Sequence, residues 1–307
     1  MQFFRTRVIA WCGKPGRVII SLLLLLTTFI TGGIMVTHAA SAVTLPKPDH
    51  VVIVMEENHA PSQIVGSPDA PYINSLIAQG ALFTDSHGVA HPSQPNYLAL
   101  FSGSTQGITD DSCPHTFSGP NLGSELSGAG QSFAGYSESM PRVGFTDCRE
   151  GGVPIIDDLY ARKHAPWVNF TNVPSSANQP WTNFPTDYST LPTVSFVIPN
   201  QNNDMHSELN PFSDDLVPQG DAWLQNHLSA YAQWAKTHNS LLIVTWDEDD
   251  NSSVNQIPTI FVGQMVKPGK YSENINHYNV LRTLEDMYGL AHVGNSANAT
   301  PITDCWQ

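Results

Sequence analysis

From residue 50 onward, short uninterrupted apolar runs alternate with longer segments in which apolar residues recur at helical spacing. The runs at 50–55, 132–137, 194–198, 241–246 and 257–262 predict strands, and the segments at 71–78, 96–101, 155–163, 220–236 and 278–288 predict helices. Short apolar strands separated by helices are typical of a parallel sheet that is covered on both faces. The pattern therefore predicts an α/β protein with one doubly wound, mostly parallel sheet, helices on both faces, and a single domain.

Two stretches lack this alternation. Residues 103–130 and 172–192 are rich in Gly, Ser, Pro and Asn, a composition that favours long loops. Because loops carried on a rigid sheet commonly surround a binding site, we expect these two stretches to form the rim of a pocket.

The first 42 residues have the pattern of a secretory signal peptide. Four basic residues precede an apolar run from 18 to 30, and Ala40-Ser41-Ala42 supplies the small residues of a cleavage site. Extended to Val36, the apolar stretch is about long enough to span a bilayer, so an uncleaved anchor is the alternative. In either case we expect residues 43–307 to lie outside the cytoplasm, secreted or anchored at the outer face of the membrane.

The charge of the chain excludes one class of partner. Four of the 13 basic residues and none of the 27 acidic ones lie in the leader, which leaves nine basic against 27 acidic residues, a formal charge of −18. Such a surface repels nucleic acid and anionic lipid, so we expect no nucleic-acid partner, and no stable membrane partner unless the leader is retained. An anionic substrate would require a metal ion that reverses the charge locally.

Cysteine usage agrees with export. Cys113 and Cys148 stand in polar, loop-like sequence and are expected to form a disulfide, whereas Cys305 would be unpaired or bridge elsewhere. None of the cysteines beyond the leader are closely spaced, which argues against a zinc site made of cysteines.

Acidic, amide and histidine side chains follow three of the predicted strands. They are Glu57 and Asn58 after the first, Asp204 and His206 after 194–198, and Asp247, Glu248, Asp249 and Asp250 after 241–246. The carboxyl ends of parallel strands meet at one edge of the sheet, where ligands bind, so we expect these side chains to converge. Oxygen ligands suit a hard divalent cation, which favours metal ligation by Glu57, Asn58, Asp247 and Glu248. The alternative is a set of solvated turns and charged surface, with His206 in a surface loop.

The segment His91-Pro-Ser-Gln-Pro-Asn-Tyr-Leu98 places Ser93 between two prolines at the start of a predicted helix. A hydroxyl at a helix N-terminus with acidic ligands nearby is what metal-assisted attack on a phosphate ester requires. The alternative is an N-cap serine. A G-x-S-x-G elbow is absent, and its nearest approach, at 130–134, runs into a strand rather than following one. We therefore predict that Ser93 is the nucleophile and that His91 lies close enough to assist it.

Taken in order, these segments resemble the phosphoesterase family that groups acid phosphatases with phosphatidylcholine-type phospholipases C, a branch of the alkaline phosphatase superfamily. The matching segments extend from His50 to Leu290 and include HVVIVMEENH, AHPSQPNYLALFSGS, VSFVIPNQNNDMHS and LLIVTWDEDD. Ser93-Gln-Pro-Asn96 also resembles the T-x-P-N element of nucleotide pyrophosphatases, whose threonine is the nucleophile. Each segment alone is only weakly specific for the family, and it is their occurrence together in a fixed order that supports the resemblance.

The resemblance implies a role for each matching residue. It implies a metal site of Glu57, Asn58, Ser93, Asp247 and Glu248, catalytic roles for Ser93, His206, Asp204 and His91, and a phosphate pocket lined by Asn96, His91 and His206. The resemblance places Asp204 and His206 near the phosphate or a second metal.

The metal ligands depart from those of binuclear zinc relatives. Such relatives have Asp-His where this chain has Asp247-Glu248, and an Asp where it has Glu57-Asn58. Loss of a histidine ligand favours oxygen-rich coordination, so we expect one divalent ion, Ca²⁺, Mg²⁺ or Mn²⁺ rather than Zn²⁺. A second metal stays open.

Together these features predict a secreted, metal-dependent phosphoesterase, first of all an acid-phosphatase-type phosphomonoesterase that forms a phosphoserine. Its substrate would be a small phosphate ester or a phospholipid head group. The alternatives are a phospholipase C-type phosphodiesterase, a metal-free serine esterase, and a non-catalytic secreted binding protein on the same scaffold.

Overall fold

The sheet is built around the most apolar strands of the chain. The computed structural model describes residues 44–150, 159–206 and 216–307, so the predicted leader at 1–42 lies outside the described residues. The eight strands are β1 (His50–Glu56), β2 (Ala81–His87), β3 (Phe133–Ser137), β4 (Asn178–Pro180), β5 (Val194–Ile198), β6 (Ser240–Trp246), β7 (Gln256–Gly263) and β8 (Gly269–Asn276). They form one sheet in the order β4-β3-β5-β1-β6-β7-β2-β8. All neighbours pair in parallel except β7, which is antiparallel to both β6 and β2.

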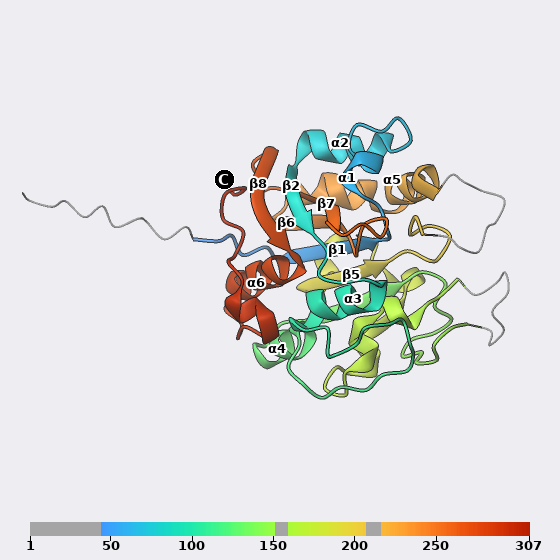
Figure 1. Cartoon of the computed structure of the whole chain (residues 1–307). Helices are drawn as coiled ribbons and strands as arrows, with labels where there is room; N and C mark the ends of the chain where they lie inside the picture. Colours follow the sequence, from blue (N-terminus) through green and yellow to red (C-terminus); the bar gives the residue numbers. More distant parts are fainter. Residues whose placement is uncertain (1–43, 151–158, 207–215) are drawn as a thin grey trace, which may run out of the picture. The chain divides into compact units, whose positions relative to one another are not determined.

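Helices cover both faces of the sheet (Figure 1). One face packs against α1 (Pro61–Ile64), α2 (Pro71–Gln79) and α5 (Leu216–Ala235), and the other against α3 (Ser93–Ser102), α4 (Leu122–Gly128) and α6 (His277–Tyr288). The central strand β1 shows why both layers are needed. Val51, Ile53 and Met55 belong to the core under α3 and α6, whereas Val52 and Val54 belong to the core under α2 and α5. Successive side chains of a strand point to opposite faces, so an entirely apolar strand is stable only between two layers.

The predicted fold class, a doubly wound and mostly parallel α/β sheet in a single domain, is confirmed. Strands β1, β3, β5, β6 and β7 and helices α2, α3, α5 and α6 lie where the apolar pattern predicted them. Strands β2, β4 and β8 were not predicted. β8 lies at the edge of the sheet and buries only Ile275, so its sequence lacks the apolar run by which buried strands are recognised.

Three predicted segments need correction. The predicted loop at 103–130 contains α4, and the one at 172–192 contains β4 and three short 3₁₀ turns. Residues 155–158 of the predicted helix at 155–163 lie outside the described residues, and the described part, 159–163, is not α-helical but ends in a 3₁₀ turn at Arg162–His164. The buried Arg162 donates hydrogen bonds to backbone carbonyls of neighbouring loops there. These contacts are tertiary, so the local spacing of apolar residues could not predict them.

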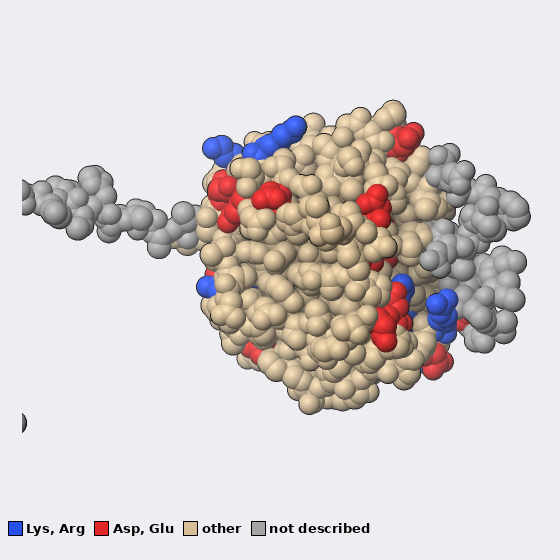
Figure 2. Space-filling model, viewed as in Figure 1, with Lys and Arg blue, Asp and Glu red and all other residues tan. Residues whose placement is uncertain are grey.

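The predicted disulfide between Cys113 and Cys148 is present, and Cys305 is a buried free thiol. Across the described ranges, no helix combines the length and apolar character needed to cross a membrane. On the face drawn in Figure 2, the basic side chains lie in small separate groups amid mostly uncharged surface.

Candidate active site

The carboxyl ends of three adjacent strands meet at one edge of the sheet. Because β1 lies between β5 and β6, the residues that follow these strands are brought together, as the sequence predicted. Glu57, Asp204 and Asp247 are fully buried there, and the N–H of Glu57 donates to the backbone oxygen of Asp204 at 2.8 Å. Above them is a cavity of about 620 Å³, lined among others by Asn58, His91, Ser93, Asp111, His206, Glu248, Asp249 and Asp250.

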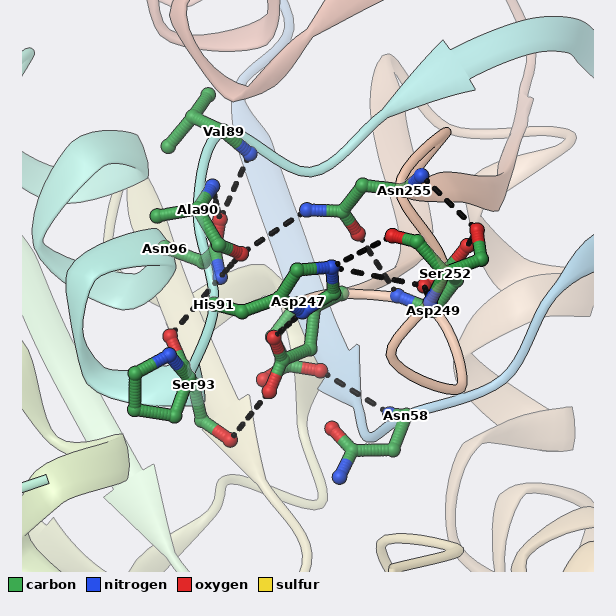
Figure 3. A network of polar contacts seen from close by, with 12 residues as sticks. Asn58, Val89, Ala90, His91, Ser93, Asn96, Asp247, Asp249, Ser252 and Asn255 are labelled. Atoms are coloured by element: carbon green, nitrogen blue, oxygen red, sulfur yellow. Dashed lines mark hydrogen bonds and ion pairs between the residues drawn. The ribbon is translucent and has the colours of Figure 1, made fainter. Parts of the chain in front are cut away.

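Ser93 is the first residue of α3, and its hydroxyl points toward the carboxylates (Figure 3). Its Oγ lies 3.0 Å from Glu57 Oε2 and 3.2 Å from Glu248 Oε1, positions from which it donates to either oxygen. The side chain makes no capping hydrogen bond, and Pro92 occupies the N-cap position. The N-cap alternative for Ser93 is therefore not observed.

Asn96 holds the loop that precedes Ser93. Its Oδ1 accepts the N–H groups of Val89 (2.8 Å) and Ala90 (3.0 Å), and its Nδ2 donates to Ala90 O at 2.8 Å. Asn255, from the loop after β6, donates to the same carbonyl at 2.9 Å (Figure 3). Asn96 is fully buried and is not among the residues that line the cavity. Its position therefore favours support of the loop over direct contact with a phosphate.

Replacement of Asn96 by alanine is expected to lower the free energy of unfolding by about 2–3 kcal/mol, because buried backbone groups lose their partner. It should also lower kcat/KM, since the same loop positions Ser93. Urea unfolding measures the first effect. The control Asn183→Ala removes an exposed asparagine that donates only to Gln179 and should change stability by less than about 0.5 kcal/mol. An Asn96→Ala protein as stable as the parent would contradict the supporting role.

His91 orients one of the carboxylates. Its Nδ1 contacts Glu248 Oε2, and its Nε2 lies 3.0 Å from the backbone oxygen of Ser252. The imidazole therefore fixes Glu248 so that the other carboxylate oxygen faces Ser93.

Asn58 joins the ends of all three strands. Its backbone has a φ of 52°, a left-handed conformation that Asn tolerates better than most residues. Its N–H donates to Asp247 Oδ1 at 3.1 Å, and its Nδ2 donates to His206 Nδ1 at 2.8 Å. Asp204 lies beneath the cavity and does not line it, and its Oδ1 accepts the N–H of His206 at 3.0 Å. Asp204 thus positions His206 from below.

The carboxyl groups at this edge are buried close to one another. Burial raises the pKa of Asp247 well above its ordinary value, and the charges of Glu57 and Glu248 raise it further. Burial also raises the pKa of Glu57, against the opposing charges of Lys163 and His206. The pKa of Glu248 rises to about 7, again because of burial. Burial therefore favours the protonated forms of these carboxyl groups, and a bound cation would favour their charged forms.

The donor set fits a hard divalent cation. Asn58 Oδ1 and Asp247 Oδ2 are buried without a hydrogen-bond partner, although a buried polar atom normally has one. Glu57 Oε2 and Glu248 Oε1 flank the same serine hydroxyl. Among the described residues, no three His, Cys, Asp or Glu side chains form a ready-made coordination shell, so the amide and hydroxyl oxygens would have to complete it. Ca²⁺, Mg²⁺ and Mn²⁺ prefer ligands of this kind.

Four further residues at the site were not predicted from the sequence. The Tyr97 hydroxyl donates to Glu57 Oε1, and the ring of Tyr97 stacks on His164 with centroids 4.8 Å apart. His164 Nε2 lies 3.0 Å from Glu57 Oε1 without hydrogen-bond geometry, and burial lowers the pKa of His164 well below its ordinary value. Lys163 pairs with Asp111 at 2.7 Å. Their own segment gives one weak signal, a run of adjacent basic residues in a chain with only 13 Lys and Arg, but nothing in it connects Lys163 or His164 with the strand ends.

Comparison with known proteins decides the family. The phosphoesterase family model matches residues 66–291 of the chain. The chain belongs to the phosphoesterase family. Phosphoesterase relatives include a phosphatidylinositol-3-phosphatase of Mycobacterium tuberculosis, which is 54% identical over 285 residues, 92% of this chain and 90% of the relative. A phosphate-repressible acid phosphatase of Penicillium chrysogenum is 30% identical over 237 residues, which are 72% of this chain and 55% of the relative.

This phosphoesterase is thus a hydrolase of phosphate ester bonds. A solved structure of an alkaline phosphatase superfamily protein from Vibrio parahaemolyticus superposes with a TM-score of 0.56 at 14% identity, over 81% of this chain and 68% of that one. At such low identity the likeness shows the shared fold alone. It confirms the alkaline phosphatase-like architecture that the order of motifs predicted.

Proposed function

We propose that this phosphoesterase is a metal-dependent phosphomonoesterase in which Ser93 attacks phosphorus. The observation that carries the proposal is the position of the Ser93 hydroxyl. It stands at the N-terminus of α3, between two carboxylates, at the same sheet edge as the unpaired oxygens of Asn58 and Asp247, and it faces a cavity large enough for a small ester. A divalent cation on these oxygens would lower the pKa of the hydroxyl and neutralise charge on the phosphate.

The chain's own residues then perform two displacements. Ser93 Oγ forms a bond to phosphorus, its proton passes to a carboxylate that accepts its hydrogen bond, and the bond from phosphorus to the ester oxygen breaks. His206, which lines the cavity, gives a proton to the leaving alkoxide and later takes one from the attacking water. Water attacks phosphorus, the bond to Ser93 breaks, and the serine recovers its proton. The products are an alcohol and inorganic phosphate.

The names of the relatives support a monoester substrate. The Mycobacterium tuberculosis relative is named a phosphatidylinositol-3-phosphatase and the fungal ones acid phosphatases, although this chain spans little more than half of the fungal proteins. Each name implies release of phosphate from a monoester. We infer a small-alcohol or phosphoinositide monoester as the substrate class. The predicted leader and the disulfide support action outside the cytoplasm.

The test compares three chromogenic substrates. Hydrolysis of p-nitrophenyl phosphate, bis-p-nitrophenyl phosphate and p-nitrophenyl acetate is measured before chelation, after it, and after addition of Mg²⁺, Mn²⁺ or Ca²⁺. We expect monoester hydrolysis that chelation abolishes and one of these ions restores. A preference for the diester would indicate a phospholipase C-type enzyme, and acetate hydrolysis that survives chelation would indicate a serine esterase. Absence of turnover with every ion and substrate would indicate a binding protein.

A further inference from the structure

An ion pair stands beside the nucleophile and has no part in the chemistry described above. Asp111 lines the same cavity as Ser93. Its Oδ1 accepts the N–H of Gln94, the residue after Ser93, at 3.0 Å, and its Oδ2 accepts from Lys163 Nζ at 2.7 Å. One carboxylate therefore joins Lys163 to the first turn of α3.

The segments that carry Asp111 and Lys163 are fixed to one another. The buried guanidinium of Arg162, next to Lys163, donates to His115 O at 3.0 Å and to Asn169 Oδ1 at 2.9 Å. The disulfide at Cys113 ties the segment around Asp111 to Cys148, whose backbone oxygen accepts the N–H of Arg162 at 3.0 Å. Lys163 exposes only 16% of its side chain. Its ammonium is thus held at a defined place, unlike that of a surface lysine.

Lys163 is the cation that acts most strongly on Glu57, one of the two carboxylates beside the Ser93 hydroxyl. Its charge lowers the pKa of Glu57 more than that of any other group does. Burial opposes the charged form of Lys163, but the carboxylates of Glu57, Asp111 and Asp247 outweigh burial and raise the pKa of Lys163. Within the described part of the chain, its ammonium donates to Asp111 alone. Since an ammonium has three N–H donors, two are left for another acceptor.

Apart from His206 and the proposed divalent cation, the residues that line the cavity offer little positive charge to a dianion. Lys163 is not itself a lining residue, but its ammonium lies 2.7 Å from Asp111, which is. Glu248, Asp249 and Asp250 line it as acidic residues. His91 is already engaged with Glu248 and with the backbone oxygen of Ser252. A phosphate monoester carries close to two negative charges near neutral pH, whereas a diester carries one. A cation beside Ser93 therefore matters most for a monoester.

We propose that Lys163 binds the second negative charge of a phosphate monoester held at Ser93, with Asp111 as the residue that positions its ammonium. Lys163 is then the residue that makes the site selective for monoesters over diesters. The inference rests on the proposed function, because it takes Ser93 as the point at which phosphorus is attacked.

The test is a ratio of two activities. In Lys163→Met, kcat/KM for p-nitrophenyl phosphate should fall about 10- to 100-fold more than kcat/KM for bis-p-nitrophenyl phosphate. Lys163→Arg, which retains the charge, should restore part of the preference. The matched control Lys236→Met removes a lysine whose Nζ donates to Gln79 on an exposed surface, and it should leave both activities unchanged. A purely structural Lys163 would lower both activities by the same factor, and that result would overturn the proposal.

A binding measurement separates this proposal from the proposed function. Calorimetry with inorganic phosphate does not depend on turnover, and it replaces the ratio if diester hydrolysis is too slow to measure. We expect Lys163→Met to weaken phosphate binding about 10- to 100-fold relative to the parent, and unchanged binding would reject the role of Lys163. Full turnover in Ser93→Ala would instead reject the proposed nucleophile, whatever Lys163 does.

Discussion

Replacement of Ser93 by alanine is expected to lower kcat for a phosphomonoester by about 10⁴-fold or more. The reason is that the variant lacks the oxygen that forms the bond to phosphorus, and among the described residues no other hydroxyl donates to both Glu57 and Glu248. Thermal unfolding should stay close to that of the parent, because the Ser93 side chain does not cap α3. Initial-rate kinetics and a melting curve of the same preparation check both statements.

A matched control lies in the same helix. Ser102, at the last turn of α3, is also buried, but its hydroxyl donates to Leu98 O at 2.8 Å and does not face the carboxylates. Ser102→Ala should therefore retain kcat within about 3-fold. Mass spectrometry of acid-quenched parent enzyme should find one added phosphoryl group on the peptide that contains Ser93. Substantial turnover in Ser93→Ala, or a phosphoryl group on another residue, would refute Ser93 as the nucleophile.

The central part of the fold could be predicted because its strands are buried on both faces. β1, β5 and β6 are entirely apolar over most of their length, and short runs of this kind are typical of strands in the middle of a parallel sheet. β2 could not be predicted in the same way. Its second half carries Thr84, Asp85 and His87, and its pairing with β8 is a long-range contact. A strand that is stabilised mainly by pairing with distant strands has few apolar residues of its own, so its sequence does not predict it clearly.

The site was predictable to the extent that it follows strand ends. Glu57, Asp247 and Glu248 directly follow β1 and β6, so the parallel order of the strands places them together. The contacts within the site could not be predicted in this way. The engagement of Asn96 with the loop at 89–90 depends on where that loop folds back over α3.

Lys163 and His164 could not be assigned to the site from their own segment. They reach Asp111 and Glu57 only because Arg162 and the disulfide hold distant loops against the sheet edge. A sequence motif identifies residues whose position is fixed relative to a single strand. Motifs do not identify residues whose position depends on several loops at once, and this is why Lys163 and His164 were not predicted.

Asp247→Asn is expected to weaken binding of Mg²⁺ or Mn²⁺ by about 100-fold or more. The geometry gives a specific reason. The N–H of Asn58 donates to Asp247 Oδ1, so an asparagine at 247 would keep its carbonyl oxygen at that position. Its NH₂ group would then replace Oδ2, the unpaired oxygen that we assign to the cation. A cation would meet a hydrogen-bond donor in place of a ligand.

Calorimetric titration of the parent and variant with each ion measures this effect without reference to activity. Asp250→Asn removes the same charge from an exposed position on the cavity wall, and it should change metal affinity by less than about 3-fold. An equal loss of metal affinity in the two variants would mean that binding of the cation depends only on the overall charge of the cavity. Unchanged affinity in Asp247→Asn would place the cation elsewhere, and preferential binding of Zn²⁺ would contradict an all-oxygen site. A selective loss in Asp247→Asn would tie the ion to the same oxygens that surround Ser93, which is the arrangement that the proposed chemistry requires.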